Sequence, residues 1–492
     1  MASGPSSETA ASVLSGSAER VSHTHPRASY TENQGVPDMI TRRDMLAGTA
    51  AAMLQPKASV INKELTSKSL ISIATFLQNE DTLDRSAAFQ ALNDYVSRHL
   101  SRISPDYGST FGLIKSGLTV SLQGIHSLSN SLILYPGVDY VFPVGSVIRA
   151  MKAGQTVVRT ASKKELLQIG QIYGSSVVSL RGGGTIDGGE LASIGLLADT
   201  VTDQSQFEVS IVRCTKRRYN VSCSGNAGDR RIKVNEPADV RVGDTVQIPG
   251  SRDEFYSVVA ISPGLAGLGR PLGADLTSAP FIHRACGLSA NDAQISTFVV
   301  QATRNDIGWA FGQNEDGIQS TNLKITGKCE WNMIGEVFIS GDAAHRDITL
   351  MHNFDRELVY VSGIGSVFDG VYIETMDDSQ ASNILPAVGN VPVGSACLNR
   401  NPAIDILGGR LTFRDINWPN NPLSTKPRIL LRTRGDTQVE NVVGATVDVG
   451  ADAQGNPTMF EKVVGGKLSV IGVRGWTNIN GKNLIRVRPI SD

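Results

Sequence analysis

The sequence has no long apolar run, few cysteines and no excess of basic residues. No stretch reaches the roughly 18 to 20 apolar residues of a membrane-spanning helix, so none is predicted after the N-terminal segment. Five cysteines lie scattered over 492 residues without a CxxC pair, which argues against a disulfide scaffold and a zinc–thiolate site. Lys plus Arg (46) nearly cancels Asp plus Glu (47). Because following a phosphate backbone requires a basic face, nucleic acid is not an expected partner.

The rest of the composition favours a globular, turn-rich fold. Hydrophobic residues are 40%, charged residues 19% and aromatics 6%, with 50 glycines, more turn formers than a helical protein needs. Cys214 and Cys223 flank a short stretch and could close a hairpin disulfide, or remain buried free thiols. The chain is therefore expected to be rich in β-structure.

The N-terminal segment has the composition of a targeting signal rather than of a folded domain. Residues 1–38 are rich in Ser, Ala, Thr and Glu without apolar periodicity, and are predicted to be disordered or a mis-annotated extension. Residues 39–58 place Arg42 and Arg43 before an apolar stretch, the order found in twin-arginine export signals. A short amphipathic helix is the alternative. The signal predicts a periplasmic or secreted protein.

One amphipathic helix is predicted, over residues 82–100. Thr82 is a suitable N-cap, and Leu92, Val96 and Leu100 follow the spacing of one helical face. A solenoid would need such a helix to cover its open end. Three strand-and-turn runs follow without further helices: LTVSLQG, SLILYPGVDYVF and SVVSLRGGGTIDGG.

Three of these motifs carry a family resemblance. Residues 80–190 resemble the opening of pectate-lyase-like proteins in three segments: DTLDRSAAFQALNDYV, HSLSNSLILYPGVDYVFPVGSVIRA and GGGTIDGG. That superfamily includes polygalacturonase-type hydrolases, pectate lyases, uronan epimerases and phage tailspikes. The resemblance implies an all-β, right-handed parallel β-helix and a polysaccharide substrate. It also implies that Asp187 sits at a structural turn.

The expected domain boundaries follow from changes in the spacing of the strand and turn motifs. Residues 80–227 would form the cap and first coils, and residues 285–492 the remaining coils. Residues 228–284 break the strand spacing and are predicted to be a small inserted β-barrel, with a long irregular loop as the alternative. Insertions on solenoids often gather on the binding face.

A repeat predicts which side chains face outward after residue 305. EVFISG (336–341) and LVYVSG (358–363) align at a spacing of 22, while DITLM (347–351) and GVYIE (370–374) align at 23, which suits one turn of a three-sided coil. Alternation is expected to bury Val337, Ile339, Val359, Val361, Ile348, Leu350, Val371 and Ile373. The same alternation is expected to expose Glu336, Phe338, Ser340, Tyr360, Ser362, Lys324, Thr349, Tyr372 and Glu374.

Coil spacing then suggests candidate catalytic residues. Outward carboxylates on adjacent coils would lie about 5 Å apart and those two coils apart about 10 Å, which brackets the separations used by retaining and inverting glycosidases. Glu336, Asp347 and Glu374 are the candidates, with Asp369 and Glu357 in reserve. The alternative for each is a solvated or turn-capping carboxylate.

The candidate substrate-binding residues are Lys324, Phe338, Arg356, Tyr360 and Tyr372. Phe338 and Tyr360 would form an outward aromatic ladder, suited to sugar stacking or to a neighbouring subunit. A lyase would use Lys324 or Arg356 as its base and Ca²⁺ or a neutralising side chain on the uronate, although no Asp-rich calcium cluster occurs. No other cofactor and no metal site is predicted.

Three functions remain open from the sequence. The favoured one is an exported enzyme that cleaves or modifies a polysaccharide, a glycoside hydrolase or a lyase. The NEDG motif at 314–317 resembles the NTD motif of polygalacturonase-type hydrolases, but the paired aspartates, Gly-His-Gly and Arg-Ile-Lys are absent. The alternatives are a tailspike-like depolymerase, which would be a homotrimer, and a non-catalytic structural β-helix. His345 and His352 are expected to be ordinary groove or surface residues.

Overall fold

The computed structural model describes residues 69–77, 83–102, 116–170, 177–202, 204–235, 239–251, 254–314, 316–374, 402–418, 431–444, 460–463, 467–474 and 487–490. Segments 1–38 and 39–58 lie outside these ranges, so export stays a prediction. Within the described ranges, no helix is long and apolar enough to cross a membrane. The proposed Cys214–Cys223 disulfide is not formed, and both thiols are free and buried, as are Cys286 and Cys329.

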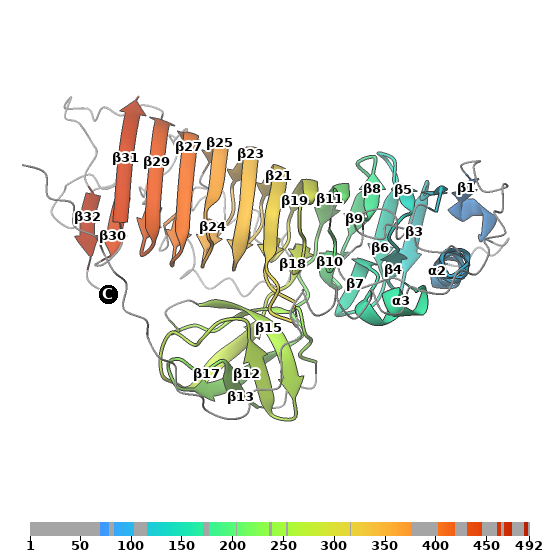
Figure 1. Ribbon diagram of the computed structural model, residues 1–492, viewed down its shortest axis with the longest axis horizontal. Helices are drawn as coiled ribbons and strands as arrows, with labels where there is room; N and C mark the ends of the chain where they lie inside the picture. Colours follow the sequence, from blue (N-terminus) through green and yellow to red (C-terminus); the bar gives the residue numbers. More distant parts are fainter. Residues whose placement is uncertain are drawn as a thin grey trace, which may run out of the picture. The chain divides into compact units, whose positions relative to one another are not determined.

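The first parallel sheet, sheet A, collects one strand from each successive coil (Figure 1). Its main path within the described residues is β1 (Ser69–Ser72), β2 (Leu118–Ser121), β5 (Asp139–Val141), β8 (Ser179–Arg181), β11 (Gln206–Val212), β19 (Thr297–Thr303), β21 (Ser320–Glu330), β23 (Gly341–Met351), β25 (Ser366–Glu374), β27 (Arg410–Trp418), β29 (Asp436–Gly444) and β31 (Lys467–Arg474). A short branch holds β3 (Ile125–Leu128), β6 (Val147–Ala150) and β9 (Thr185–Asp187).

The second parallel sheet, sheet B, takes the other strand of each coil. Along the chain it contains β4 (Leu132–Leu134), β7 (Gln155–Thr160), β10 (Ala192–Ala198), β18 (Cys286–Ala290), β20 (Ile307–Phe311), β22 (Ile334–Phe338), β24 (Arg356–Tyr360), β26 (Ile404–Ile406), β28 (Leu431–Thr433), β30 (Phe460–Val463) and β32 (Val487–Ile490). Parallel pairing of strands about 22 residues apart requires the chain to wind around a common core. The predicted right-handed parallel β-helix is therefore confirmed.

The coils change shape along the solenoid. In the first coils, β8 and β9 are separate short strands, and both pair with the single longer strand β11. From β11 onward sheet A continues as long strands, which reach eleven residues in β21 and β23. The early coils thus have three sides. The later coils, for which the 22- and 23-residue repeats predicted three sides, have two sheets joined by turns.

The helix α2 (Ser86–Leu100) covers the first coils, close to the expected range. Thr82 lies outside the described residues. The N-cap is Arg85, which makes no side-chain cap bond, and Asp84 accepts the backbone N–H of Ser86 at 2.9 Å. The buried face carries Phe89, Leu92, Val96 and Leu100, and Asn93 accepts the backbone N–H of Ile133 in sheet B at 3.3 Å. Two short helical segments, η1 (Ile73–Thr75) and α3 (Lys163–Gln168), complete the helical structure of the described residues.

The insertion is a closed antiparallel barrel. It contains β12 (Asn220–Gly225), β13 (Arg231–Val234), β14 (Thr245–Gln247), β15 (Phe255–Ser262), β16 (Leu265–Leu268) and β17 (Leu276–His283), drawn as the group of strands around β15 in Figure 1. It begins at Asn220, before residue 228, because β12 is needed to close the ring against β13 and β17.

Buried ion pairs hold the barrel on the solenoid. Arg217 and Arg284, in the segments that enter and leave the barrel, both contact the fully buried Asp306 at 2.9 and 2.7 Å. Burial favours a higher pKa for Asp306, but the two guanidinium groups outweigh it and lower that pKa. Arg356 makes a third connection, since it contacts Glu254 of the barrel edge at 3.0 Å.

An asparagine ladder fixes the turns that follow the sheet A strands β19, β21 and β23. The buried Asn305 donates to Asn332 at 3.0 Å, and Asn332 donates to Asn353 at 3.0 Å on the next coil. Asn353 in turn donates to Glu357. These amides satisfy one another in the core, so successive coils turn at the same place. The residue before each rung, Arg304, Trp331 or His352, has a left-handed backbone with φ of 56 to 59°.

Candidate functional site

The structure corrects the outward placement of three predicted site residues. Glu336, Phe338 and Tyr360 are fully buried in the solenoid. Phe338 and Tyr360 do stack, with ring centroids 5.2 Å apart, but the ladder that they form lies inside the core. The predicted sugar platform is wrong at these positions, and Glu336 is out of reach of a polymer.

The error has a specific cause in sheet B. Four residues that were predicted to face the core instead form a separate apolar cluster with Phe255 of the barrel. They are Val337, Ile339, Val359 and Val361. In sheet B, the strands β18, β20, β22 and β24 are buried at every position, so both of their faces are covered. Alternation on sheet A was read correctly, since Ile348, Leu350, Val371 and Ile373 all lie in the solenoid core.

Asp347 forms part of a bend in sheet A. It adopts a left-handed backbone (φ 50°), as do Gly370 (φ 68°) and Asp415 (φ 51°) on the next two coils. The strand registers skip all three residues, so they stack as a column of bulges. Asp tolerates this conformation better than most residues because its short side chain can bond locally. The bend gives Asp347 a structural role, so its presence at this position does not require a catalytic role.

The other predicted residues divide between core and surface. Arg356 is buried and contacts Glu254, Asp355 and Asp405, so it is held by carboxylates of the protein. The reserve Glu357 is buried at the end of the asparagine ladder, and the reserve Asp369 is half-buried in β25. Lys324 is exposed on sheet A, as expected.

Glu374 and Tyr372 lie on the outer face of sheet A, as predicted, and join a polar cluster there. The Tyr372 hydroxyl donates to Glu374 Oε2 at 2.9 Å. Partial burial, and then this hydrogen bond, raises the pKa of Tyr372, so the phenol stays protonated. Glu374 Oε1 lies 3.1 Å from His352 Nε2. Thus a single carboxylate contacts a phenol and an imidazole.

The same imidazole also faces a second carboxylate. Glu330 Oε1 lies 4.0 Å from His352 Nδ1, and Glu330 Oε2 forms an ion pair with Lys328 at 2.6 Å. Strand register places Glu330 beside Met351 and Met351 beside Glu374, so the two glutamates occupy one row of sheet A two coils apart. The glutamate side chains are 19% and 26% exposed, which leaves both within reach of a ligand.

An aromatic ring lies against this cluster. The Trp331 indole packs on the His352 ring with centroids 4.4 Å apart. Both residues occupy the left-handed position that precedes the asparagine ladder. Arg304 has the same backbone one coil earlier, so this conformation belongs to the turn. The turn fixes the two rings on adjacent coils beside the carboxylates.

Sequence reasoning missed Glu330 and Trp331, and it interpreted His352 as an ordinary groove or surface residue. The repeat aligned the middles of the strands, whereas these residues stand at strand ends where spacing varies. The available signal was the recurrence of Asn305, Asn332 and Asn353, because the residue before each of the last two is a ring of the cluster. In the described part of the chain, no group of three or more His, Cys, Asp or Glu could hold a metal ion.

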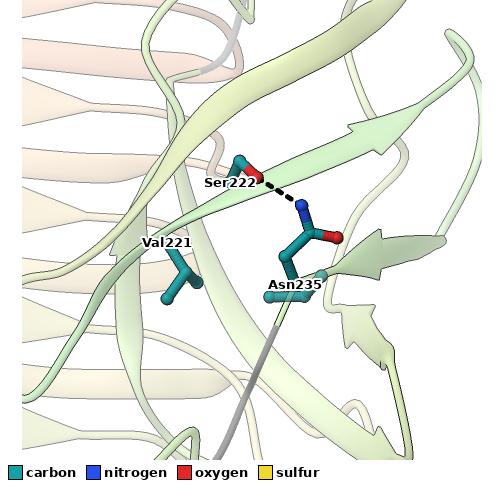
Figure 2. Close-up of a pocket in the computed structure, with 4 residues that line it drawn as sticks. Val221, Ser222 and Asn235 are labelled. Carbon is teal, nitrogen blue, oxygen red and sulfur yellow. Dashed lines mark hydrogen bonds between the residues drawn. The ribbon is translucent and has the colours of Figure 1, made fainter.

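A hollow on the barrel carries no comparable chemistry. It has a volume of about 560 Å³ and is lined by Val221, Ser222, Val234 and Asn235. Figure 2 shows the Asn235 amide pointing to Ser222, to which it donates at 2.6 Å. None of these four residues is titratable, so the described lining of the hollow offers no acid or base.

Comparisons with known proteins give fold neighbours and no relative in sequence. No family model matches the sequence, and no curated protein matches it either. Among solved structures, the DFA-IIIase of Arthrobacter chlorophenolicus A6 in complex with GF2 is 9% identical with a TM-score of 0.39, covering 87% of this chain and 92% of its own.

Two further solved structures come from a bacterial surface and a phage. PfbA, a surface adhesin of Streptococcus pneumoniae, is 9% identical with a TM-score of 0.34, covering 85% of this chain and 94% of its own. The Gp54 tailspike of Acinetobacter baumannii bacteriophage AP22, in complex with capsular saccharide, is 8% identical with a TM-score of 0.19, covering 83% and 76%. All three are right-handed β-helix proteins. With TM-scores below 0.5, these likenesses decide nothing about the site.

Proposed function

We propose that this protein is a glycoside hydrolase that cleaves a polysaccharide on the outer face of sheet A. The observation that carries the proposal is the placement of Glu330 and Glu374 on one row of the sheet, two coils apart, on either side of His352. Coils lie about 4.8 Å apart, so the two backbones are separated by about 9 to 10 Å. The carboxylates lean toward one shared imidazole, which brings them closer than their backbones.

This separation suits hydrolysis with inversion. Inverting glycosidases use two carboxyl groups about 6.5 to 9.5 Å apart, which leaves room for a water molecule beside the sugar. Glu330, in its ion pair with Lys328, is the carboxylate that activates this water. Glu374 is the acid that protonates the leaving oxygen. Tyr372 and His352 are positioning residues, because each contacts Glu374.

The surroundings favour a saccharide over a compact ligand. An open sheet face can bind an extended chain, and Trp331 offers a ring for stacking on a sugar. A lyase mechanism through Arg356 is disfavoured, because three carboxylates surround that buried guanidinium group. Every residue of the cluster comes from one chain, so the proposal requires no homotrimer.

The test is an activity screen followed by matched variants. The protein is incubated with a panel of neutral and acidic polysaccharides, and new reducing ends are measured. Replacing either glutamate, as Glu330→Gln or Glu374→Gln, should lower turnover by about 10²- to 10⁴-fold. Asp347→Asn is the matched control and should keep near-normal turnover, because asparagine also tolerates the left-handed backbone.

Two outcomes would overturn the proposal. Full activity in both glutamine variants would place the site elsewhere. Products with the ultraviolet absorbance of unsaturated uronates would identify a lyase instead. For a hydrolase, proton NMR of the first products should show the inverted anomer.

A further inference from the structure

Four successive coils carry a large side chain at the left-handed turn position that follows a sheet A strand. They are Arg213, Arg304, Trp331 and His352, which follow β11, β19, β21 and β23. The backbone N–H of each one donates to the carbonyl of the last residue of the next sheet A strand, at 2.7 to 3.4 Å. The four side chains therefore form a column along the solenoid axis, one coil apart.

The backbone of this turn does not account for the long side chains in the column. A left-handed φ is favoured by Gly, Asn, Asp and His, and other residues adopt it at a cost. The column of bulges in sheet A shows the difference, because it places Asp347, Gly370 and Asp415 at left-handed positions. Asparagine would fit the turn better than Arg304 or Trp331. These two side chains therefore point to a function at the surface.

Arg304 is a cation without a partner. It is exposed, and within the described part of the chain its side chain forms no hydrogen bond or ion pair. Arg213, one coil earlier, is instead held by Asp187 at 2.5 Å. Glu330, one coil later, pairs with Lys328 at 2.6 Å. An exposed guanidinium group of this kind can bind a carboxylate or another oxyanion through two parallel hydrogen bonds.

Arg304 lies beside the proposed catalytic pair. Thr303, the residue before it, is in register with Glu330, so Arg304 stands one coil before Glu330 and three coils before Glu374. In the proposed reaction the leaving oxygen is on the Glu374 side, and the sugar ring that water attacks is on the Glu330 side. Arg304 therefore faces the sugars that precede the cleaved bond, with the Trp331 ring on the adjacent coil.

We propose that Arg304 binds an anionic group of the substrate and makes the enzyme specific for an acidic polysaccharide. This inference rests on the proposed hydrolysis for the position of the substrate. Arg304 binds a carboxylate or a sulfate ester on a sugar that precedes the cleaved bond, while Trp331 stacks on a neighbouring ring. A neutral polysaccharide lacks this contact and binds more weakly.

The experiment measures binding in the double variant Glu330→Gln/Glu374→Gln, so that cleavage cannot interfere. Matched pairs of hexasaccharides are titrated by calorimetry: galacturonate and its methyl ester, hyaluronan and its methyl ester, and a sulfated galactan and its desulfated form. In at least one pair the anionic member should bind about tenfold more tightly than its neutral partner. The responding pair identifies the group as a carboxylate or a sulfate. Adding Arg304→Gln should remove the preference.

Two further variants in the same background separate recognition from structure. Arg346→Gln removes an exposed arginine from the middle of β23, away from the column, and should leave the preference unchanged. Arg304→Asn should remove the preference without lowering the melting temperature, because asparagine favours the left-handed backbone. A clearly lower melting temperature would show that Arg304 supports the turn, and it would contradict a role in recognition.

The inference fails if no anionic hexasaccharide binds, if none binds more tightly than its neutral partner, or if the preference survives Arg304→Gln. Inorganic sulfate that binds as tightly as the best hexasaccharide would show a simple anion site and also contradict it. Cleavage by the wild type without any preference for acidic polymers would count against this inference alone. Binding that depends on Arg304, without cleavage of any polymer, would support the Arg304 contact and count only against the proposed hydrolysis.

Discussion

Glu336 and His345 face each other inside the solenoid, with Oε1 and Nε2 2.8 Å apart and both side chains fully buried. The His345 ring stacks on Phe368 with centroids 3.7 Å apart. Glu336 Oε2 and His345 Nδ1 have no other hydrogen-bond partner. The pair thus satisfies itself only in part, in the middle of an aromatic core.

Removing one member of this pair should destabilise the fold. Glu336→Ala leaves the imidazole buried without its partner, and an unsatisfied buried polar group costs about 1 to 3 kcal/mol. Replacing both residues with leucine should recover most of this loss, since apolar groups then fill the space. Urea unfolding measures both effects. A stable Glu336→Ala protein would contradict the buried placement, and the double variant should retain polysaccharide cleavage.

Trp331 should contribute to binding more than to the chemical step. Trp331→Ala removes the ring that packs on His352, and an aromatic contact of this kind is worth about 0.5 to 1.5 kcal/mol beyond its buried area. We expect KM to rise about three- to tenfold with a smaller change in kcat. Trp331→Phe should restore most of the loss. A change confined to kcat would show that Trp331 acts only by positioning His352.

Arg356 should be essential for the stability of the joint between barrel and solenoid. Arg356→Met removes the guanidinium group that contacts both Asp355 and Asp405, and breaking a buried ion pair should cost about 3 to 5 kcal/mol in urea unfolding. Arg410→Met is the control, because Arg410 is 72% exposed and lies 4.0 Å from Asp436, and it should change stability by less than about 0.5 kcal/mol. Equal effects would refute a special role for Arg356.

Asp292 should make stability fall as the pH rises. Burial, and then the nearby Asp199 and Asp316, raise the pKa of Asp292 to about 7 from its usual 3.8. A raised pKa means that the folded protein holds a proton that the unfolded chain releases. The resulting stability is present below about pH 4 and is lost as the pH rises to about 7.

The variant Asp292→Asn has no carboxyl proton to release at this position. Its free energy of unfolding, relative to that of the wild type, should therefore increase as the pH rises from about 4 to about 7. The relative gain cannot exceed about 1.4 kcal/mol per pH unit. Urea unfolding at pH 4.5, 5.5, 6.5 and 7.5 measures the difference. A difference that does not change with pH would show that Asp292 is ionised throughout.

The local pattern of the chain determined its architecture. The apolar spacing in 82–100 predicted the capping helix, and repeats of 22 and 23 residues predicted a wound parallel sheet. The same alternation correctly placed Tyr372 and Glu374 on the open face of sheet A. These features depend on residues close in sequence, so they can be read without the rest of the fold.

Only the tertiary structure decided which residues share the site. Alternation has a period of two, and it cannot say which face is covered when another domain packs on the sheet. On the outer face of sheet B, Val337 and Val359 share an apolar cluster with Phe255 of the barrel, while Glu336 is buried. Glu330 and Glu374 lie 44 residues apart and meet through His352 because two coils stack in register, a relationship that exists only once the chain is wound.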